Sequence, residues 1–232
     1  MITISKAGTA TVMADTHMLK LLSWLSPAFP IGGFAWSSGL ETACKSEAIF
    51  DAASLETWIT TGLQHGFMRQ DVILLGVTWD CAKESADGLA EVNETALALA
   101  GSLERYEETT SLGAAFARSA APWRDNKTAS LPDPLAYPVA VGTIARENGI
   151  PKDQAVTAYL HAVVSAQIQA ALRLFPLGQA KAMSLQKSLE GAIVATAAFA
   201  EGATLDDLGS AAIMMDIAGM KHETLQSRIF RS

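Results

Sequence analysis

The sequence predicts an all-α protein, a single compact domain of about ten helices around a central apolar helix. Half of the 232 residues are hydrophobic but only 7% are aromatic, so the apolar surface comes mostly from Ala, Leu, Val and Ile. Alanine has the highest helix propensity, and apolar residues recur at helical spacing along most of the chain. A chain of this length can bury a substantial core, and one domain is the simplest arrangement.

The chain divides into three predicted segments. Residues 1–15 are polar and small without a continuous apolar stretch, which predicts a disordered N-terminus and no secretory signal. Residues 16–220 form the all-α domain, and residues 221–232 form a polar C-terminal tail. Cys44 and Cys81 lie far apart, without the spacing of a disulfide framework or a metal site, which favours a cytoplasmic protein.

Helical spacing defines the elements of the first half. The first helix is expected to begin after Asp15 or Thr16, which are good N-cap residues. A second helix runs from about Trp36 to Lys45, and Asp51 begins a third. The apolar face of the first helix comprises Met18, Leu21, Leu22 and Leu25.

The third helix is expected to bend near Gly66 and to continue to Lys83. Two further helices are predicted over residues 93–100 and 103–121. Arg105, Glu107 and Glu108 are expected on the solvent face of the second of these.

The second half begins with an exposed loop over residues 125–134, which is rich in turn-forming residues. A helix then resumes at Leu135 and ends at Gly149. Pro151 begins the most apolar helix, which extends to Phe175 and is expected to be the central one. Three elements complete the domain: a long helix over residues 180–200, a capped turn over residues 204–208 and a last helix over residues 210–220.

Residues 21–41 contain the most distinctive stretch, in which Pro27, Pro30, Gly32 and Gly33 interrupt two helices. Proline fixes φ and glycine permits positive φ or close backbone approach, so this is a shaped loop between helices. The spacing matches neither a phosphate-binding loop nor a dinucleotide fingerprint. Without further information, a loop that only allows tight helix packing is the simpler interpretation.

Charge and hydropathy exclude several classes of protein. The net charge of −7 argues against a general nucleic-acid-binding protein, although residues 217–232 carry three cations and one acid. The most apolar stretch, residues 155–175, contains His161, Gln167 and Arg173, which are costly in lipid, so no transmembrane segment is expected.

No motif in the sequence indicates catalysis. The four histidines have no metal-ligand spacing, no serine or cysteine has a nucleophile signature, and the adjacent carboxylates Glu107 and Glu108 are expected at the surface. Glu41 and Arg173 are single charges in apolar stretches, so we place both near a common surface around the loop. The alternative is that Glu41 is an ordinary surface residue and Arg173 extends from a helix end.

The chain resembles the UreF family of urease accessory proteins. The resemblance spans nearly the whole length after residue 15 and rests on S-P-A-F-P-I-G-G-F-A-W-S-S-G-L-E (26–41), L-R-L-F-P-L-G-Q (172–179) and H-E-T-L-Q-S-R-I-F-R-S (222–232). T-S-L-G-A-A-F-A-R (110–118) adds weaker support. The tail departs from the family pattern at Lys221, where arginine is usual, and at Leu225 and Gln226, where Gln-Tyr is usual.

The resemblance implies a non-enzymatic, all-α chaperone of metallocentre assembly. It would link a UreD or UreH scaffold to the GTPase UreG, and so couple GTP hydrolysis to nickel insertion into apo-urease. The resemblance implies no cofactor of its own, because nickel and GTP are bound by partners, and it implies a cytoplasmic homodimer without nucleic-acid or membrane contacts.

The matching residues form two expected contact groups. The tail is expected to order on binding the scaffold, with Phe230 as its anchor and its arginines giving charge complementarity. The tail group comprises His222, Glu223, Ser227, Arg228, Phe230 and Arg231. The loop group, expected to influence the GTPase, comprises Pro30, Gly32, Gly33, Glu41, Arg173 and Gln179.

The rival interpretation is an α-helical enzyme acting on a small molecule. Its pocket would be built from distant helices, with His65, His161 or Glu41 converging on the substrate. A third interpretation is a purely structural helical dimer.

Overall fold

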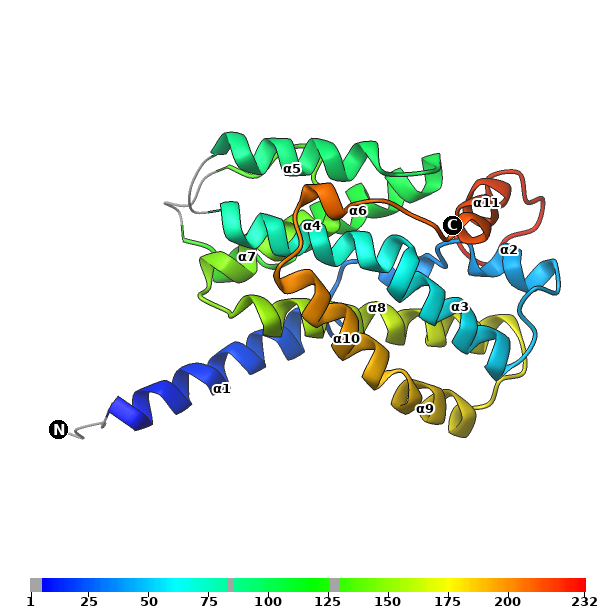
Figure 1. The fold of residues 1–232 in the computed structure, drawn as a ribbon, viewed down its shortest axis with the longest axis horizontal. Helices are drawn as coiled ribbons and strands as arrows, with labels where there is room; N and C mark the ends of the chain where they lie inside the picture. The colour runs from blue at the N-terminus through cyan, green and yellow to red at the C-terminus, as the bar shows by residue number, and fades with distance from the viewer. Residues whose placement is uncertain (1–5, 83–85, 126–129) are drawn as a thin grey trace.

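The computed structural model describes residues 6–82, 86–125 and 130–232. These residues form eleven α-helices and three short 3-10 helices and no strand, which confirms the all-α prediction (Figure 1). The α-helices are α1 (Lys6–Trp24), α2 (Leu40–Lys45), α3 (Ala52–His65), α4 (Phe67–Cys81), α5 (Ala86–Ala98), α6 (Leu103–Ser119), α7 (Tyr137–Glu147), α8 (Lys152–Leu174), α9 (Gln179–Ser188), α10 (Glu190–Glu201) and α11 (Ile213–His222). The 3-10 helices are η1 (Gly33–Ala35), η2 (Ala121–Trp123) and η3 (Leu205–Asp207).

The core is built around α8, as predicted, together with α4 and α7. Helix α8 contacts α2, α3, α4, α7, α9 and α10, and α7 is buried from Tyr137 to Ala145. Helices α4 and α7 pack so closely that a Cβ at Gly142 would lie only 2.6 Å from the Leu75 carbonyl oxygen. Glycine at this position therefore sets the distance between the two helices.

Two predicted helix boundaries have clear physical causes. At the start of α3 the Asp51 carboxylate accepts a hydrogen bond from the backbone N–H of Ser54, and the Ser54 hydroxyl oxygen accepts one from the backbone N–H of Asp51. This capping box confirms the expected start of the helix. At its other end the chain breaks at Gly66, where the predicted bend separates α3 from α4.

Several predictions about helices need correction, among them the start of α5, which is Ala86 and not Asn93. Helix α1 begins at Lys6, well before the expected start after Asp15 or Thr16, while residues 1–5 lie outside the described chain and disorder of the N-terminus stays a prediction. The start of α1 projects away from the body (Figure 1). Of the expected apolar face, Leu21 is buried, whereas Met18 and Leu22 are exposed. The single helix expected over residues 180–200 is two helices that meet at Leu189, just before Gly191, a residue of low helix propensity.

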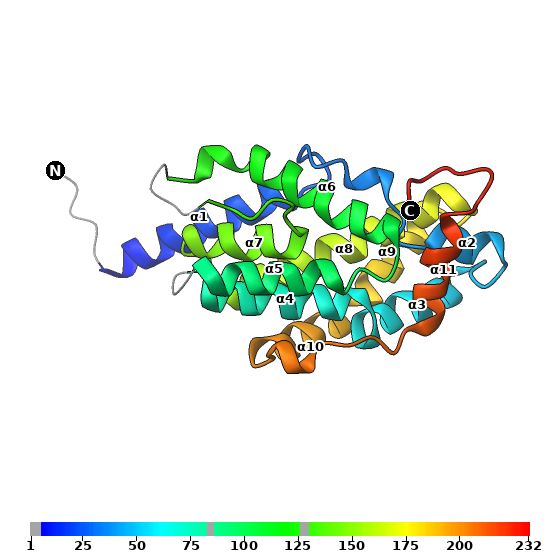
Figure 2. The same cartoon turned by 90° about the horizontal axis from the view of Figure 1, so that it is seen from above.

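Both views place the start of α1 and the C-terminus toward opposite ends of the molecule. Helices α2 and α11 gather with the C-terminus at one end, and α1 extends toward the N-terminus at the other (Figures 1 and 2). Among the described residues, only α8 is long and apolar enough to cross a membrane by length and composition. Half of its most apolar window is buried in the fold, as in the core helix of many globular proteins.

Candidate functional site

The loop between α1 and α2 is a defined structure, as its prolines and glycines predict. The backbone N–H of Phe29 donates to the Ser26 carbonyl, and Gly32 has a positive φ of 77° at the start of η1. Helix α2 begins at Leu40, later than the expected Trp36. Gly39 precedes it with φ 84°, and a Cβ there would meet the backbone nitrogen of Gly219 in α11 at 2.8 Å.

The C-terminal tail, residues 221–232, packs on this loop along its backbone. The N–H of Ser37 donates to the Ser232 carbonyl at 2.8 Å, and the N–H of Arg231 donates to the Ala35 carbonyl at 2.8 Å. The Phe230 side chain is only 4% exposed, and Ser232 is buried. In this structure the body itself provides the acceptors and the apolar pocket for the tail, and the expectation that the tail orders on partner binding stays a prediction.

Glu41 is the acceptor that holds the tail. Its carboxylate is fully buried and accepts the backbone N–H groups of Ile229 and Phe230, each at 2.9 Å. Lys45 Nζ lies 3.1 Å from Oε1, and His222 Nε2 lies 3.2 Å from Oε2. Burial alone would raise the pKa of Glu41, but these donors, led by the backbone of Phe230, lower it below its ordinary value.

A second buried carboxylate, Glu104 at the start of α6, completes the attachment. Its Oε2 lies 2.7 Å from His222 Nδ1, so the imidazole bridges Glu104 and Glu41. The Arg228 guanidinium donates to the other oxygen of Glu104. We refer to Glu41, Glu104, His222 and Arg228 as the tail lock.

Aromatic contacts hold the tail from the outside. The guanidinium of Arg173, on α8, lies 4.1 Å from the centre of the Phe230 ring and donates from Nη1 to the Phe34 carbonyl at 2.7 Å. The guanidinium of Arg231 lies 4.6 Å from the Trp36 ring centre. Arg173 thus joins the loop to the tail through a cation–π contact and a hydrogen bond.

The structure brings the two predicted contact groups together at one site. In each group, some of the residues are exposed and the others are buried. Phe230 bridges Glu41 and Arg173, so the proposed proximity of these two charges is supported, but Glu41 is buried and has no surface to offer a partner. The residues exposed or partly exposed are Pro30, Gly32, Gly33, Arg173, Gln179, Glu223, Ser227, Arg228 and Arg231. Those buried are Glu41, His222 and Phe230.

A cavity of about 550 Å³ lies between the loop and α8. Its lining combines aromatic residues such as Trp24, Trp36 and Phe230 with a charged cluster from α4, α6 and α8. We call Asp71, Arg105, Glu108 and Tyr159 the floor cluster.

Charges in the floor cluster are paired. Arg105 Nη2 lies 2.7 Å from Asp71 Oδ1, and Nη1 lies 3.0 Å from Glu108 Oε2. The Tyr159 hydroxyl donates to Asp71 at 2.9 Å, and the Ser38 hydroxyl links Glu108 to the loop at 3.0 Å. Burial raises the pKa of Glu108 despite the nearby guanidinium, and burial together with Asp71 raises that of Tyr159.

The floor cluster corrects the prediction for α6. Arg105 and Glu108 were expected on the solvent face, but Glu108 is buried and only Glu107 is exposed. Their i,i+3 spacing is typical of a surface pair, and the partners that bury them lie 34 or more residues away. The sequence alone offered no signal for this pairing, nor for Glu104 or Ser37.

The residues of the rival enzyme interpretation are not brought together. Glu41 is buried in the tail lock, His65 lines a different cavity, and His161 is exposed on α8. Neither of the two larger cavities is lined by more than one of them. Within the described residues, no group of three or more His, Cys, Asp or Glu side chains is arranged to hold a metal ion.

The fold and site define a helical protein whose C-terminal tail is held on the α1–α2 loop by buried, bridged charges. A model of the UreF family matches residues 49–190. The chain is 43% identical to the urease accessory protein UreF of Allorhizobium ampelinum, over 96% of this chain and 100% of that protein. It is 45% and 46% identical to those of Rhizobium etli and Mesorhizobium japonicum, over 93% of this chain and 96% of each. The chain therefore belongs to the UreF family.

Proposed function

We propose that this protein acts in urease maturation as a non-enzymatic adaptor. It would bind a UreD- or UreH-like scaffold and a UreG-like GTPase, and so help couple GTP hydrolysis to nickel insertion into apo-urease. Relatives at 43–46% identity over nearly the whole chain are named urease accessory proteins, which supports this role. Nickel and GTP would be bound by the partners, and a cytoplasmic homodimer would present the recognition surface twice.

The observation that carries the adaptor proposal is the composition of the loop–tail surface. Phe34 is 76% exposed and Ile229 is 55% exposed. Arg173 donates to the Phe34 carbonyl, and Arg228 and Arg231 flank Ile229 in the tail, on a chain that is acidic overall. Apolar side chains beside arginines are the composition of protein-binding hot spots. We assign this surface to the scaffold-like partner.

The test is co-elution with the cognate scaffold on a sizing column. Removing the tail after Met220 would also uncover Glu41 and Glu104, so truncation confounds lost contact with a damaged fold. The Phe34→Ser variant is a more specific test, because the Phe34 side chain is already exposed to solvent and its removal should leave the fold intact. Phe50→Ser, which changes another exposed phenylalanine, at 66%, is the matched control.

We expect Phe34→Ser to weaken co-elution by about tenfold or more, as for a hot-spot aromatic residue, and Phe50→Ser to leave it unchanged. Equal binding by the two variants would reject the assignment of this surface. Failure of the unmodified chain to bind the scaffold would reject the adaptor proposal itself. Light scattering at micromolar concentration tests the proposed homodimer.

A further inference from the structure

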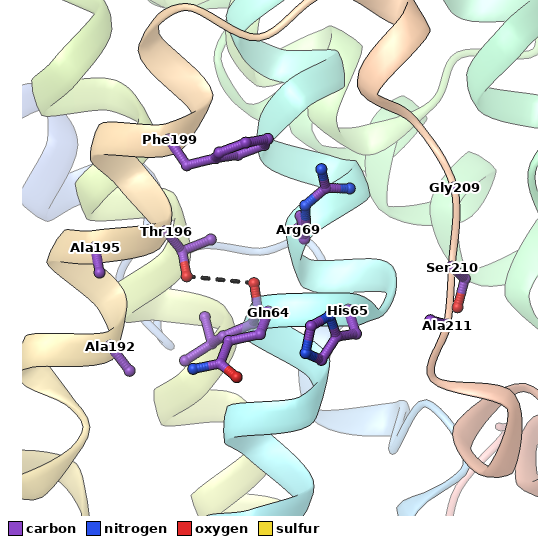
Figure 3. A pocket seen from close by; sticks show the side chains of 11 residues that line it. Gln64, His65, Arg69, Ala192, Ala195, Thr196, Phe199, Gly209, Ser210 and Ala211 are labelled. Carbon is purple, nitrogen blue, oxygen red and sulfur yellow. Dashed lines mark hydrogen bonds between the residues drawn. The ribbon is translucent and has the colours of Figure 1, made fainter.

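A second cavity, of about 610 Å³, lies away from the loop–tail site and shares no lining residue with it. Its walls come from the end of α3, the start of α4, α10 and the chain that precedes α11 (Figure 3). Its volume is in the range of pockets that bind small organic molecules.

The polar groups of this pocket are cationic or neutral. The polar side chains of the lining include Arg69, His65 and Gln64 (Figure 3), and no carboxylate is among the lining residues. Within the described part of the chain, none of the ion pairs involves Arg69, although the protein carries 24 acids and 17 bases. A half-buried guanidinium is therefore left to pair with a charge from outside the chain.

Two contacts fix the position of this guanidinium. Nη1 of Arg69 donates to the Asp207 carbonyl at 2.8 Å, and the Arg69 Cζ lies 4.5 Å from the centre of the Phe199 ring. A guanidinium has five N–H donors in a rigid fork, so donors remain for a ligand. Because the fork is held before any ligand arrives, binding loses less side-chain entropy.

Two acidic side chains of the neighbouring segments are engaged elsewhere. The Asp207 carboxylate accepts the backbone N–H and the hydroxyl of Thr204, and the Asp216 carboxylate accepts the Ser210 hydroxyl. Ser210 sits on the wall opposite α10 in Figure 3, in a segment held by the hydrogen bond from Ala211 N–H to the His65 carbonyl. These carboxylates therefore help to fix the segments around the pocket without forming an ion pair with Arg69.

The remaining wall is apolar. Ala192, Ala195 and Phe199 of α10 face the pocket, and we call them the α10 wall. Phe199 is 46% exposed. The Thr196 hydroxyl, on the same wall, already donates to the Leu63 carbonyl at 3.2 Å, so the α10 wall offers a ligand apolar contacts and not hydrogen bonds.

We propose that this pocket binds a carboxylate that carries an apolar group, with the carboxylate on Arg69 and the apolar group against the α10 wall. A planar carboxylate matches the guanidinium fork. Such a ligand could be a small organic acid or the C-terminal carboxylate of a peptide, and both present the same chemistry.

The test is calorimetric titration of the full chain with two matched pairs of probes. The first pair is 3-phenylpropionate and 3-phenylpropionamide, and the second is the tripeptide Ala-Ala-Phe with a free and with an amidated C-terminus. Each acid is expected to bind at least about tenfold more tightly than its amide, because only the acid forms charge-assisted hydrogen bonds. If the peptide acid binds more tightly than phenylpropionate, the pocket favours a peptide C-terminus; if it does not, the pocket favours a small organic acid.

Two variants locate the binding. Arg69→Gln is expected to weaken both acids by about tenfold and to abolish the preference over the amides, while Arg118→Gln, an exposed arginine on α6, leaves both unchanged. Ala195→Phe fills the pocket from an exposed position and should abolish binding without loss of fold, which circular dichroism checks.

The proposal is overturned if neither acid binds the unmodified chain, if acids and amides bind equally, or if Ala195→Phe binds like the unmodified chain. The acid–amide comparison needs no variant, so it decides the question even if Arg69→Gln fails to fold. None of these measurements uses a urease partner, so they stand apart from the test of the adaptor proposal.

Discussion

Replacing Glu41 by alanine should release the C-terminal tail from the body. The Glu41 carboxylate accepts the N–H groups of Ile229 and Phe230 and meets Lys45 and His222. If the tail stayed docked in the variant, each unpaired buried N–H would cost about 1–3 kcal/mol. The two together would cost roughly 2–6 kcal/mol, while burying Phe230 returns only about 1.5–3 kcal/mol.

Hydrogen exchange measured by mass spectrometry follows this release directly. We expect peptides from residues 221–232 to exchange at least roughly thirtyfold faster in Glu41→Ala, which corresponds to about 2 kcal/mol of lost protection. Peptides from α4, α7 and α8 should keep their protection, because the tail can detach without opening the core. Glu107→Ala, which removes an exposed carboxylate of α6, is the control.

Unchanged exchange of the tail in Glu41→Ala would refute this reasoning. It would mean that Arg173, Arg231 and the backbone contacts to Ser37 and Ala35 hold the tail without the carboxylate. Faster exchange throughout the chain would also contradict it, since the tail lock would then support the whole fold and not the tail alone.

Three further predictions test the packing around the site. Arg105→Ala leaves the buried carboxylates of Asp71 and Glu108 without their cation and should cost about 3–5 kcal/mol in urea unfolding; a loss below about 1 kcal/mol would show that the cluster is solvated. Gly39→Ala should destabilise the protein more than Gly32→Ala in thermal unfolding. Both positions have a positive φ, which costs about 1–2 kcal/mol, but only Gly39 also places its Cβ within 2.8 Å of another backbone, so equal losses would contradict the close α2–α11 contact. Burial and the Glu41 charge raise the pKa of the Cys44 thiol to about 11 from its ordinary 9.0. In a Cys81→Ser chain, Cys44 should therefore react with a maleimide at pH 8 roughly a hundredfold more slowly than an ordinary thiol. A rate near that of a free thiol would count against the burial of Cys44.

Local signals predicted most of the fold. The Asp51 cap, the break at Gly66 and Pro151 ahead of α8 each act within one helical turn, and the structure follows them. The division at Leu189 was missed because neither proline nor a cap residue marks it. The early start of α1 was missed because residues 6–15 lack the apolar stripe on which the prediction depended.

The site was predicted only as far as its loop and tail. Pro27, Pro30, Gly32 and Gly33 predict a shaped loop, but nothing local indicates that Glu41 pairs with His222, which lies 181 residues away. Glu104 and Glu108 have the spacing of ordinary helix-surface acids, and only the tertiary fold buries them. Periodicity reports one helix face at a time, so a charge whose partner comes from another helix looks like a solvated one.

The closed tail bears on how a partner would engage the loop–tail surface. A partner that binds the closed tail meets Phe34 and Arg231, whereas one that binds an open tail meets Phe230, which must first leave its pocket. A ligand shifts an equilibrium only by its differential affinity for the two states. Glu41→Ala therefore distinguishes the two modes, since it removes the cost of opening: it strengthens binding to an open-tail partner and weakens binding to a closed-tail partner. In the closed mode the buried carboxylate of Glu41 acts through the position of the tail and not by touching the partner.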